Sequence, residues 1–244
     1  TGESTGTVHR RHCAYYAGAA GAEERLLNWK TDSMAFLRAD FGNLEAAWRW
    51  AVDHGDLDAT RQMMNGLFFV AEMTGWFDAL LPFFEDAAVT LRTRWQQASD
   101  DAVLGQETAH LLTNLLFIQQ SLFMHVGWLT RVQDVLDEMQ AILAVIDHDA
   151  LWQEHDFWRR WAATIYALNL GNYADANTMA RDLLCFVQTV GQVFWPWRAD
   201  IGNRFWEMHL HAMLGATARL LGWYEAARAD SAGALQDSEC MGEQ

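Results

Sequence analysis

The chain has 244 residues, of which 51% are hydrophobic and 20% are charged, and its formal net charge is −15. This apolar content is typical of a globular protein and argues against a disordered one. The negative charge repels phosphate backbones, so we expect no nucleic-acid partner. Because only 2 residues are proline while alanine, leucine and arginine are plentiful, the composition predicts a nearly all-helical fold.

The cysteines and the ends of the chain indicate where the protein works. Cys13, Cys185 and Cys240 are odd in number and form no Cys-x-x-Cys motif, which favours a reducing cytoplasm. Cys185 lies in an apolar run and is expected in the core. No apolar run approaches the roughly 18 residues of a membrane span, so we expect no membrane partner. Residues 1–6 and 239–244 are interpreted as a flexible lead and a tail of a piece cut from a longer protein.

A short sequence motif recurs along the chain: glycine, then tryptophan or asparagine, then a large apolar residue. Successive copies are 52, 44 and 51 residues apart, which is typical of stacked helical hairpins. Glycine ends a helix because it adopts the left-handed conformation without a steric penalty. The copies are Gly75-Trp76-Phe77, Gly127-Trp128-Leu129, Gly171-Asn172-Tyr173 and Gly222-Trp223-Tyr224.

The last copy carries a family resemblance. Around Gly222, small residues at Gly215, Ala227 and Ala234 have the spacing that lets two helices approach closely, and this stretch resembles a tetratricopeptide repeat. The Gly171 copy keeps part of the pattern, and the other two are degenerate. The resemblance implies an all-α, right-handed superhelical solenoid of about five helical hairpins. The spacing exceeds the usual 34 residues, which implies longer helices or longer loops.

The predicted helices follow from apolar periodicity and capping residues. Residues 8–27 form a helix, and Asn43 is expected to cap a second one that Gly55 ends. Pro82 is expected to delay or kink the helix that contains it. We expect no internal linker that separates domains. The predicted hairpins pair residues 57–74 with 76–95, 103–126 with 128–146, 150–170 with 173–190, and 198–221 with 223–237.

Residues 8–60 carry a second resemblance. The run from His12 to Tyr16 (HCAYY) and the run from Gly42 to Ala51 (GNLEAAWRWA), followed by Gly55-Asp56, resemble a segment of STAND-class signalling ATPases. In these proteins, which include large bacterial regulators of the LuxR/AfsR kind, the segment joins the nucleotide-binding and winged-helix modules to a repeat sensor. Gly42 departs from the family, where an acidic residue or asparagine is common.

The resemblance implies a division of the chain and a mechanism. Residues 7–56 would be linking helices, and residues 57–238 would be the repeat sensor. The sensor would bind a partner protein or a small inducer. Binding would relieve an intramolecular contact with the nucleotide-binding module and permit oligomerisation and effector output, with the helix at 8–27 as the relay.

No catalytic signature is present, so we expect no enzyme activity and no cofactor in this segment. The sequence contains neither a phosphate-binding Gly-x-x-x-x-Gly-Lys loop nor a Gly-x-Ser-x-Gly elbow nor a His-Glu-x-x-His motif. An acid–imidazole cluster at residues 147–156 could hold a divalent cation. The favoured interpretation is a solvated turn that caps a helix, so no metal site is predicted.

The candidate binding site follows from the geometry of a solenoid. The first helix of each hairpin lines the concave surface, and its stripe mixes aromatic, amide and imidazole side chains, which suit peptides and small planar ligands. The alternative is that these side chains only fill the middle of the superhelix. The candidate residues for a protein, peptide or small-molecule partner in the groove are Asn65, His110, Asn114, Trp158, Trp161, Trp206 and His209.

Two other functions stay open from the sequence. A constitutive repeat scaffold would bind peptides without changing an ATPase, since sensor and scaffold share one fold. A helical hydrolase would use a metal at residues 147–156.

Overall fold

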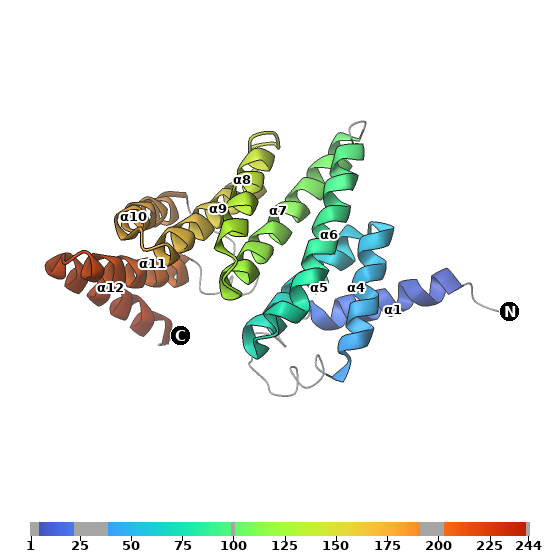
Figure 1. Ribbon diagram of the computed structural model, residues 1–244, viewed down its shortest axis with the longest axis horizontal. Helices are drawn as coiled ribbons and strands as arrows, with labels where there is room; N and C mark the ends of the chain where they lie inside the picture. Colours follow the sequence, from blue (N-terminus) through green and yellow to red (C-terminus); the bar gives the residue numbers. More distant parts are fainter. Residues whose placement is uncertain (1–4, 22–38, 99–100, 191–202, 243–244) are drawn as a thin grey trace. The chain divides into compact units, whose positions relative to one another are not determined.

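The computed structural model describes residues 5–21, 39–98, 101–190 and 203–242. In these residues the protein is all-α: it has ten helices and no strand (Figure 1). The helices are α1 (Thr5–Ala20), α4 (Phe41–His54), α5 (Leu57–Thr74), α6 (Phe77–Gln97), α7 (Ala102–His125), α8 (Leu129–Leu143), α9 (Ala150–Asn169), α10 (Tyr173–Val190), α11 (Asn203–Leu220) and α12 (Tyr224–Gly242).

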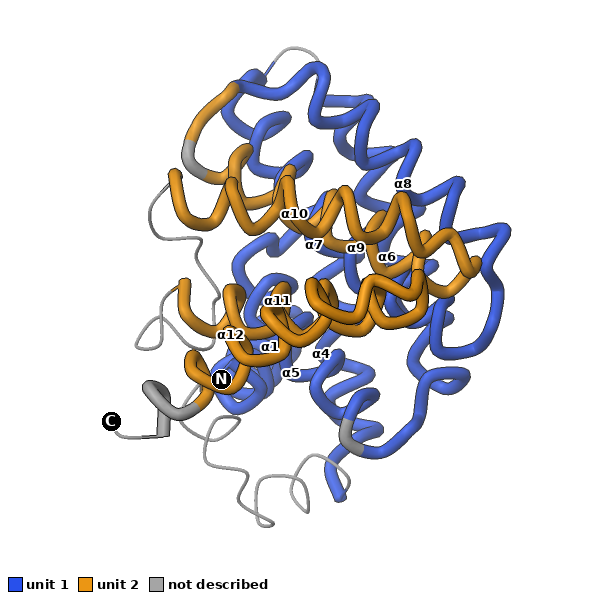
Figure 2. The backbone as a smooth tube through the Cα atoms, turned by 90° about the vertical axis from the view of Figure 1, so that its left-hand side faces the viewer, with its two compact units in different colours: residues 1–147 blue, residues 148–244 orange. Residues whose placement is uncertain are grey.

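The chain divides into two compact units, residues 1–147 and 148–244 (Figure 2). The boundary falls in the short connection between α8 and α9, where the sequence shows no linker. In the first unit α1 packs on α4 and α5, α5 on α6 and α7, and α7 on α6 and α8. In the second unit each helix from α9 to α12 packs on the next one.

The recurring glycines end helices as predicted. Gly75, Gly127, Gly171 and Gly222 have φ between 71° and 80°, and each lies directly between two paired helices. After Gly127, the backbone N–H of Trp128 donates to Phe123 O at 2.8 Å. The same bond pattern follows Gly171 and Gly222, so three of the four turns are Schellman motifs.

After the second turn glycine, Trp128 packs on the end of the preceding helix, α7. The ring centroids of Trp128 and Phe123 are 5.9 Å apart, which is the apolar contact that accompanies a Schellman turn. In the last hairpin, a Cβ at Gly215 would lie 3.3 Å from Ala227 O, so α11 and α12 approach closely where small residues predict it.

The residues that cap the helices agree only in part with the expected ones. Asp101 and Asp149 cap α7 and α9, because each side chain accepts a hydrogen bond from a backbone N–H three residues on. Asn43 is not a cap: α4 begins at Phe41, and the N–H groups of Asn43 and Leu44 donate to Asp40 O. Pro82 lies inside α6, which begins at Phe77, so the start of the helix is not delayed.

Cys185 was expected in the core, and this is wrong, because its side chain is exposed. The buried positions of α10 are Ala176, Asn177, Ala180, Leu183 and Val187, and Cys185 projects from another face of the same helix. The buried residues of α1, Cys13, Tyr16, Ala17 and Ala20, share one face of that helix. Burial, together with the charge of Asp56, raises the pKa of the Cys13 thiol to about 11.

The predicted ends lie partly outside the described residues. Residues 1–4 and 243–244 of the predicted lead and tail are not described, and neither are residues 22–38 or residues 198–202 of the predicted last hairpin. Helix α1 begins at Thr5 and α12 continues to Gly242. Among the described helices, none combines the length and the apolar character that a bilayer crossing requires.

Candidate partner-binding site

Four of the predicted site residues come together in the second unit, where α9 and α11 meet. Trp206 on α11 is surrounded by rings from α9: its centroid is 5.1 Å from those of Phe157, Trp158 and Trp161. The three pairs are edge-to-face, with interplanar angles of 68°, 80° and 71°. This geometry is favourable for aromatic pairs beyond the burial of their area.

Helical spacing brings these side chains to one place. Trp158 and Trp161 are three residues apart on α9, and Trp206 and His209 are three residues apart on α11. Residues at this spacing are neighbours on one face of a helix. The predicted stripe therefore becomes a continuous aromatic contact between the first helices of two consecutive hairpins.

The cluster has a buried base and a half-exposed edge. Trp158 is 4% exposed and Trp206 is 2% exposed, so these two rings are packing residues. Trp161, Phe205 and His209 are each half-buried, and we call these three residues the aromatic surface. The His209 ring lies 4.1 Å from Phe205 and 6.5 Å from Trp161 between centroids.

The hydrogen bond of His209 defines the chemistry of its ring. His209 Nδ1 lies 2.8 Å from Phe205 O. A carbonyl oxygen only accepts, so Nδ1 carries the proton and donates. In the neutral imidazole the other nitrogen, Nε2, is then an acceptor. The aromatic surface therefore presents ring faces and edges together with one hydrogen-bond acceptor.

Glu154 lies one turn before Trp158 on the same helix. Its Oε1 accepts a hydrogen bond from Trp158 Nε1 at 3.3 Å. Burial raises the pKa of the Glu154 carboxyl, and the bond from Trp158 offsets part of this effect. Glu154 thus orients a tryptophan of the buried base.

The other three predicted residues lie in the first unit and are not part of this cluster. Asn65 is half-buried on α5, and Asn114 is half-buried on α7. His110 on α7 is only 5% exposed, and its Nε2 lies 3.3 Å from Gln106 Nε2. A His110 side chain this deeply buried offers little surface to a partner.

The first helices α5 and α7 also meet through polar and aromatic groups. His125 Nε2 on α7 lies 2.9 Å from Glu72 Oε1 on α5. The same ring stacks on Phe77, with centroids 4.2 Å apart and an interplanar angle of 5°. Glu72 and His125 thus join the first helices of two consecutive hairpins.

The side chains of the acid–imidazole cluster at 147–156 mostly contact groups of the same helix, α9. Asp149 caps α9, and the His148 ring stacks on Trp152 at 4.3 Å. Asp156 pairs with Arg159 at 3.0 Å and with Arg160 at 2.6 Å. The expectation of a solvated turn holds for residues 147–149, which are exposed.

Further along α9 the same expectation is wrong, because His155 and Asp156 are 1% and 4% exposed. Within the described ranges, no three side chains of His, Cys, Asp or Glu gather as metal ligands would.

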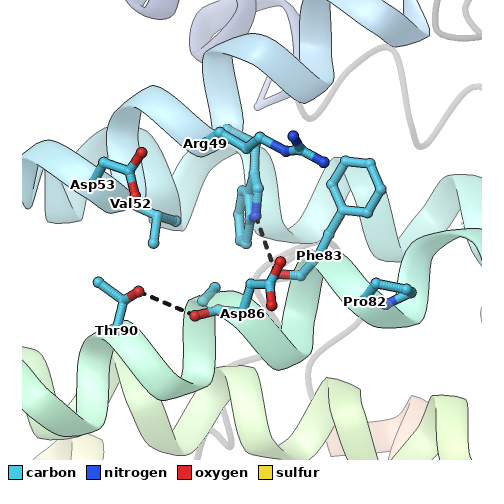
Figure 3. A pocket seen from close by; sticks show the side chains of 9 residues that line it. Arg49, Val52, Asp53, Pro82, Phe83, Asp86 and Thr90 are labelled. Carbon is cyan, nitrogen blue, oxygen red and sulfur yellow. Dashed lines mark hydrogen bonds between the residues drawn. The ribbon is translucent and has the colours of Figure 1, made fainter.

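Sequence reasoning missed a cavity of about 240 Å³ in the first unit, between α4 and α6 (Figure 3). Its walls include Arg49 and Asp53 from α4 and Phe83 and Asp86 from α6. Arg49 lies in the run from Gly42 to Ala51 that carries the STAND resemblance, but neither that run nor the positions of the other three residues reveal how the two helices pack.

Comparisons of the chain with protein-family models, curated proteins and solved structures give no match. The function is therefore argued from the geometry of these sites and from the resemblance in the sequence.

Proposed function

We propose that this chain is a tetratricopeptide-like repeat domain that binds a partner on the aromatic surface of Trp161, Phe205 and His209. In this proposal it is the cytoplasmic sensor of a STAND-class signalling ATPase. The hairpin turns at positive-φ glycines and the packing of α5 on α7 support a repeat architecture. The Gly55-Asp56 turn after α4 adds support for the linking segment, since Asp56 caps α5.

One observation carries the binding role: half-exposed rings rest on a buried aromatic base. Trp206 contacts Trp161 edge-to-face and His209 in a tilted arrangement, and Trp158 packs edge-to-face on Trp206. Rigid aromatic side chains are frequent hot spots in interfaces, and a preorganised ring loses little entropy when a partner binds. A purely structural core would bury the edge as well as the base.

The sensor role requires that binding is communicated to another module. A ligand shifts a resting state only by its differential affinity for the two states. Helix α1 packs on α4 and α5, and its fit on α5 is tight, because a Cβ at Gly66 would lie 2.8 Å from Ala20 O. In the proposal, this close fit makes α1 the element that passes on a displacement of the repeats.

The test is thermal unfolding of the chain against panels of peptides and small metabolites. A ligand at about 100 times its Kd stabilises the folded state by about 2.7 kcal/mol. We expect a stabilising hit whose effect disappears in Trp161→Ala and His209→Ala, each compared with its own ligand-free midpoint. Trp223→Ala is the matched control, because Trp223 is 49% exposed in the last hairpin turn and should leave the effect intact.

A hit that stabilises both surface variants as strongly as the wild type contradicts the assigned surface. A second measurement, on the full-length protein, distinguishes the sensor hypothesis from the scaffold hypothesis. A partner of a sensor changes the ATP hydrolysis rate, whereas a partner of a constitutive scaffold binds equally well and leaves that rate unchanged.

A further inference from the structure

The cavity between α4 and α6 lies in the first unit, whereas the residues of the aromatic surface belong to the second. Figure 3 shows Arg49 and Asp53 on α4 opposite Phe83 and Asp86 on α6. Trp48 also lines it, and its Nε1–H donates to Phe83 O at 3.3 Å, which ties the two helices together. The walls are therefore held by a specific contact across 35 residues of sequence.

The charges around the cavity are unequal. Arg49 is neutralised by Glu45, whose Oε1 lies 2.7 Å from its Nη2. Among the described residues, the carboxylates of Asp53 and Asp86 have no hydrogen bond or ion pair; Arg94 Nη2 donates to the backbone O of Asp53, not to its side chain. Two exposed carboxylates that pair with no cation of the described residues thus line the same cavity as Arg49.

Apolar and aromatic groups complete the lining. Phe83 is half-buried and faces the guanidinium of Arg49, with 5.8 Å from the guanidinium carbon to the ring centroid. Val52 and Pro82 add aliphatic surface. Because the Arg49 guanidinium already lies over the Phe83 ring, the ring adds apolar surface to the lining, and the two carboxylates supply the attraction for a cation.

We propose that this cavity binds a small organic cation, an ammonium or guanidinium compound with a short apolar part. The carboxylates of Asp53 and Asp86 would hold the charged group, and Phe83 would contact the apolar part. The volume of about 240 Å³ is below the 300–1,000 Å³ typical of drug-sized ligands, which restricts the ligand to metabolite size. An anion is disfavoured because Arg49 is already paired.

The test uses three probes of one shape and different charge: benzylammonium, benzyl alcohol and benzoate, titrated at neutral pH and followed by NMR. We expect benzylammonium to bind most tightly and benzoate least, with shifts in the amides of α4 and α6. Asp53→Asn and Asp86→Asn should each weaken benzylammonium binding roughly two- to fivefold, the range for exposed ion pairs. Arg49→Gln should strengthen binding, because it removes a competing cation and frees Glu45.

Asp134→Asn is the matched control, because Asp134 is exposed on α8 and its replacement makes the same change in net charge. If this variant weakens binding as much as Asp86→Asn, general attraction to an acidic protein explains the result and the proposal fails. The proposal also fails if benzyl alcohol binds as tightly as benzylammonium. Shifts confined to other helices, or no shift at all at millimolar probe, overturn it as well.

Discussion

Gly215 tests the close packing of α11 on α12, on which the last hairpin depends. A Cβ at this position would lie 2.6 Å from Ser231 Oγ, and 3.3 Å from both Ala227 O and Ser231 N. Rotation of the Ser231 side chain relieves the shortest contact only in part, and the two backbone contacts move only if α12 shifts. Such overpacking costs about 1–3 kcal/mol.

The same substitution also has a favourable effect, because alanine is preferred over glycine in a helix interior by about 1 kcal/mol. The balance predicts that Gly215→Ala lowers the free energy of unfolding by about 1 kcal/mol. Urea unfolding measures this change. In the variant that also carries Ser231→Ala, the Oγ contact is absent, so the loss should be smaller than the sum of the two single changes.

A contrary result is easy to recognise. If Gly215→Ala stabilises the chain by the full 1 kcal/mol or so of helix preference, then α12 does not lie against this face of α11. If the double substitution is simply additive, Ser231 is not the neighbour that a larger residue meets.

Three further predictions use the same unfolding assay. In Gly66→Ala the new Cβ would lie 2.8 Å from a backbone oxygen of α1, so this variant should destabilise the chain by about 1–2 kcal/mol. In Gly18→Ala the new Cβ meets nothing within 4 Å, so this variant should stabilise the chain by up to about 1 kcal/mol. Equal effects of the two substitutions would contradict the α1–α5 packing. Asn177→Ala should cost about 1–3 kcal/mol, because the buried Asn177 Nδ2 donates to Thr217 Oγ1 at 2.7 Å, and a neutral result would argue against this link between α10 and α11. The pKa of Glu154 is raised in the folded state above its usual value of 4.5, so the folded state holds this proton more tightly and the free energy of unfolding of the wild type falls as pH rises from about that value. Glu154→Gln lacks this loss, so the stability of the variant relative to the wild type should grow with pH. A difference in stability that stays constant with pH would refute the raised pKa.

The local features of the fold could be read from the sequence because their causes are local. A glycine at the end of an apolar stripe indicates a left-handed backbone conformation, and Gly127, Gly171 and Gly222 all adopt this conformation in Schellman turns. Helices Leu57–Thr74 and Tyr173–Val190 have the predicted bounds. One error is local as well. Asn43 was expected to cap the helix, but α4 begins after Asp40 and includes Gly42, because a single glycine near a helix start does not exclude the residues before it from the helix.

The position of Cys185 shows where apolar content misleads. A run of five apolar residues covers more than one turn of a helix, so some of them must face away from the core. Capping at the 147–156 turn was easier to interpret, since the Asp149 cap acts on a backbone N–H only three residues away.

The candidate site was partly predictable for the same reason. The spacing of Trp158 with Trp161 and of Trp206 with His209 places each pair on one face, and these four residues meet. The sequence could not show which rings are buried, because that depends on how α9 and α11 pack. The cavity formed by Asp53 and Asp86 was missed, since it depends on the packing of helices that are distant in sequence. The STAND sensor role stays a prediction.

The most direct test of the central claim is amide hydrogen exchange, measured with and without a peptide or metabolite that stabilises the chain in the thermal screen. The account predicts slower exchange in α9 and α11 around the aromatic surface of Trp161, Phe205 and His209, and no slowing in Trp161→Ala. Slower exchange confined to other helices, or equal slowing in Trp161→Ala, would show that the partner binds elsewhere and that these rings serve only to pack α9 on α11.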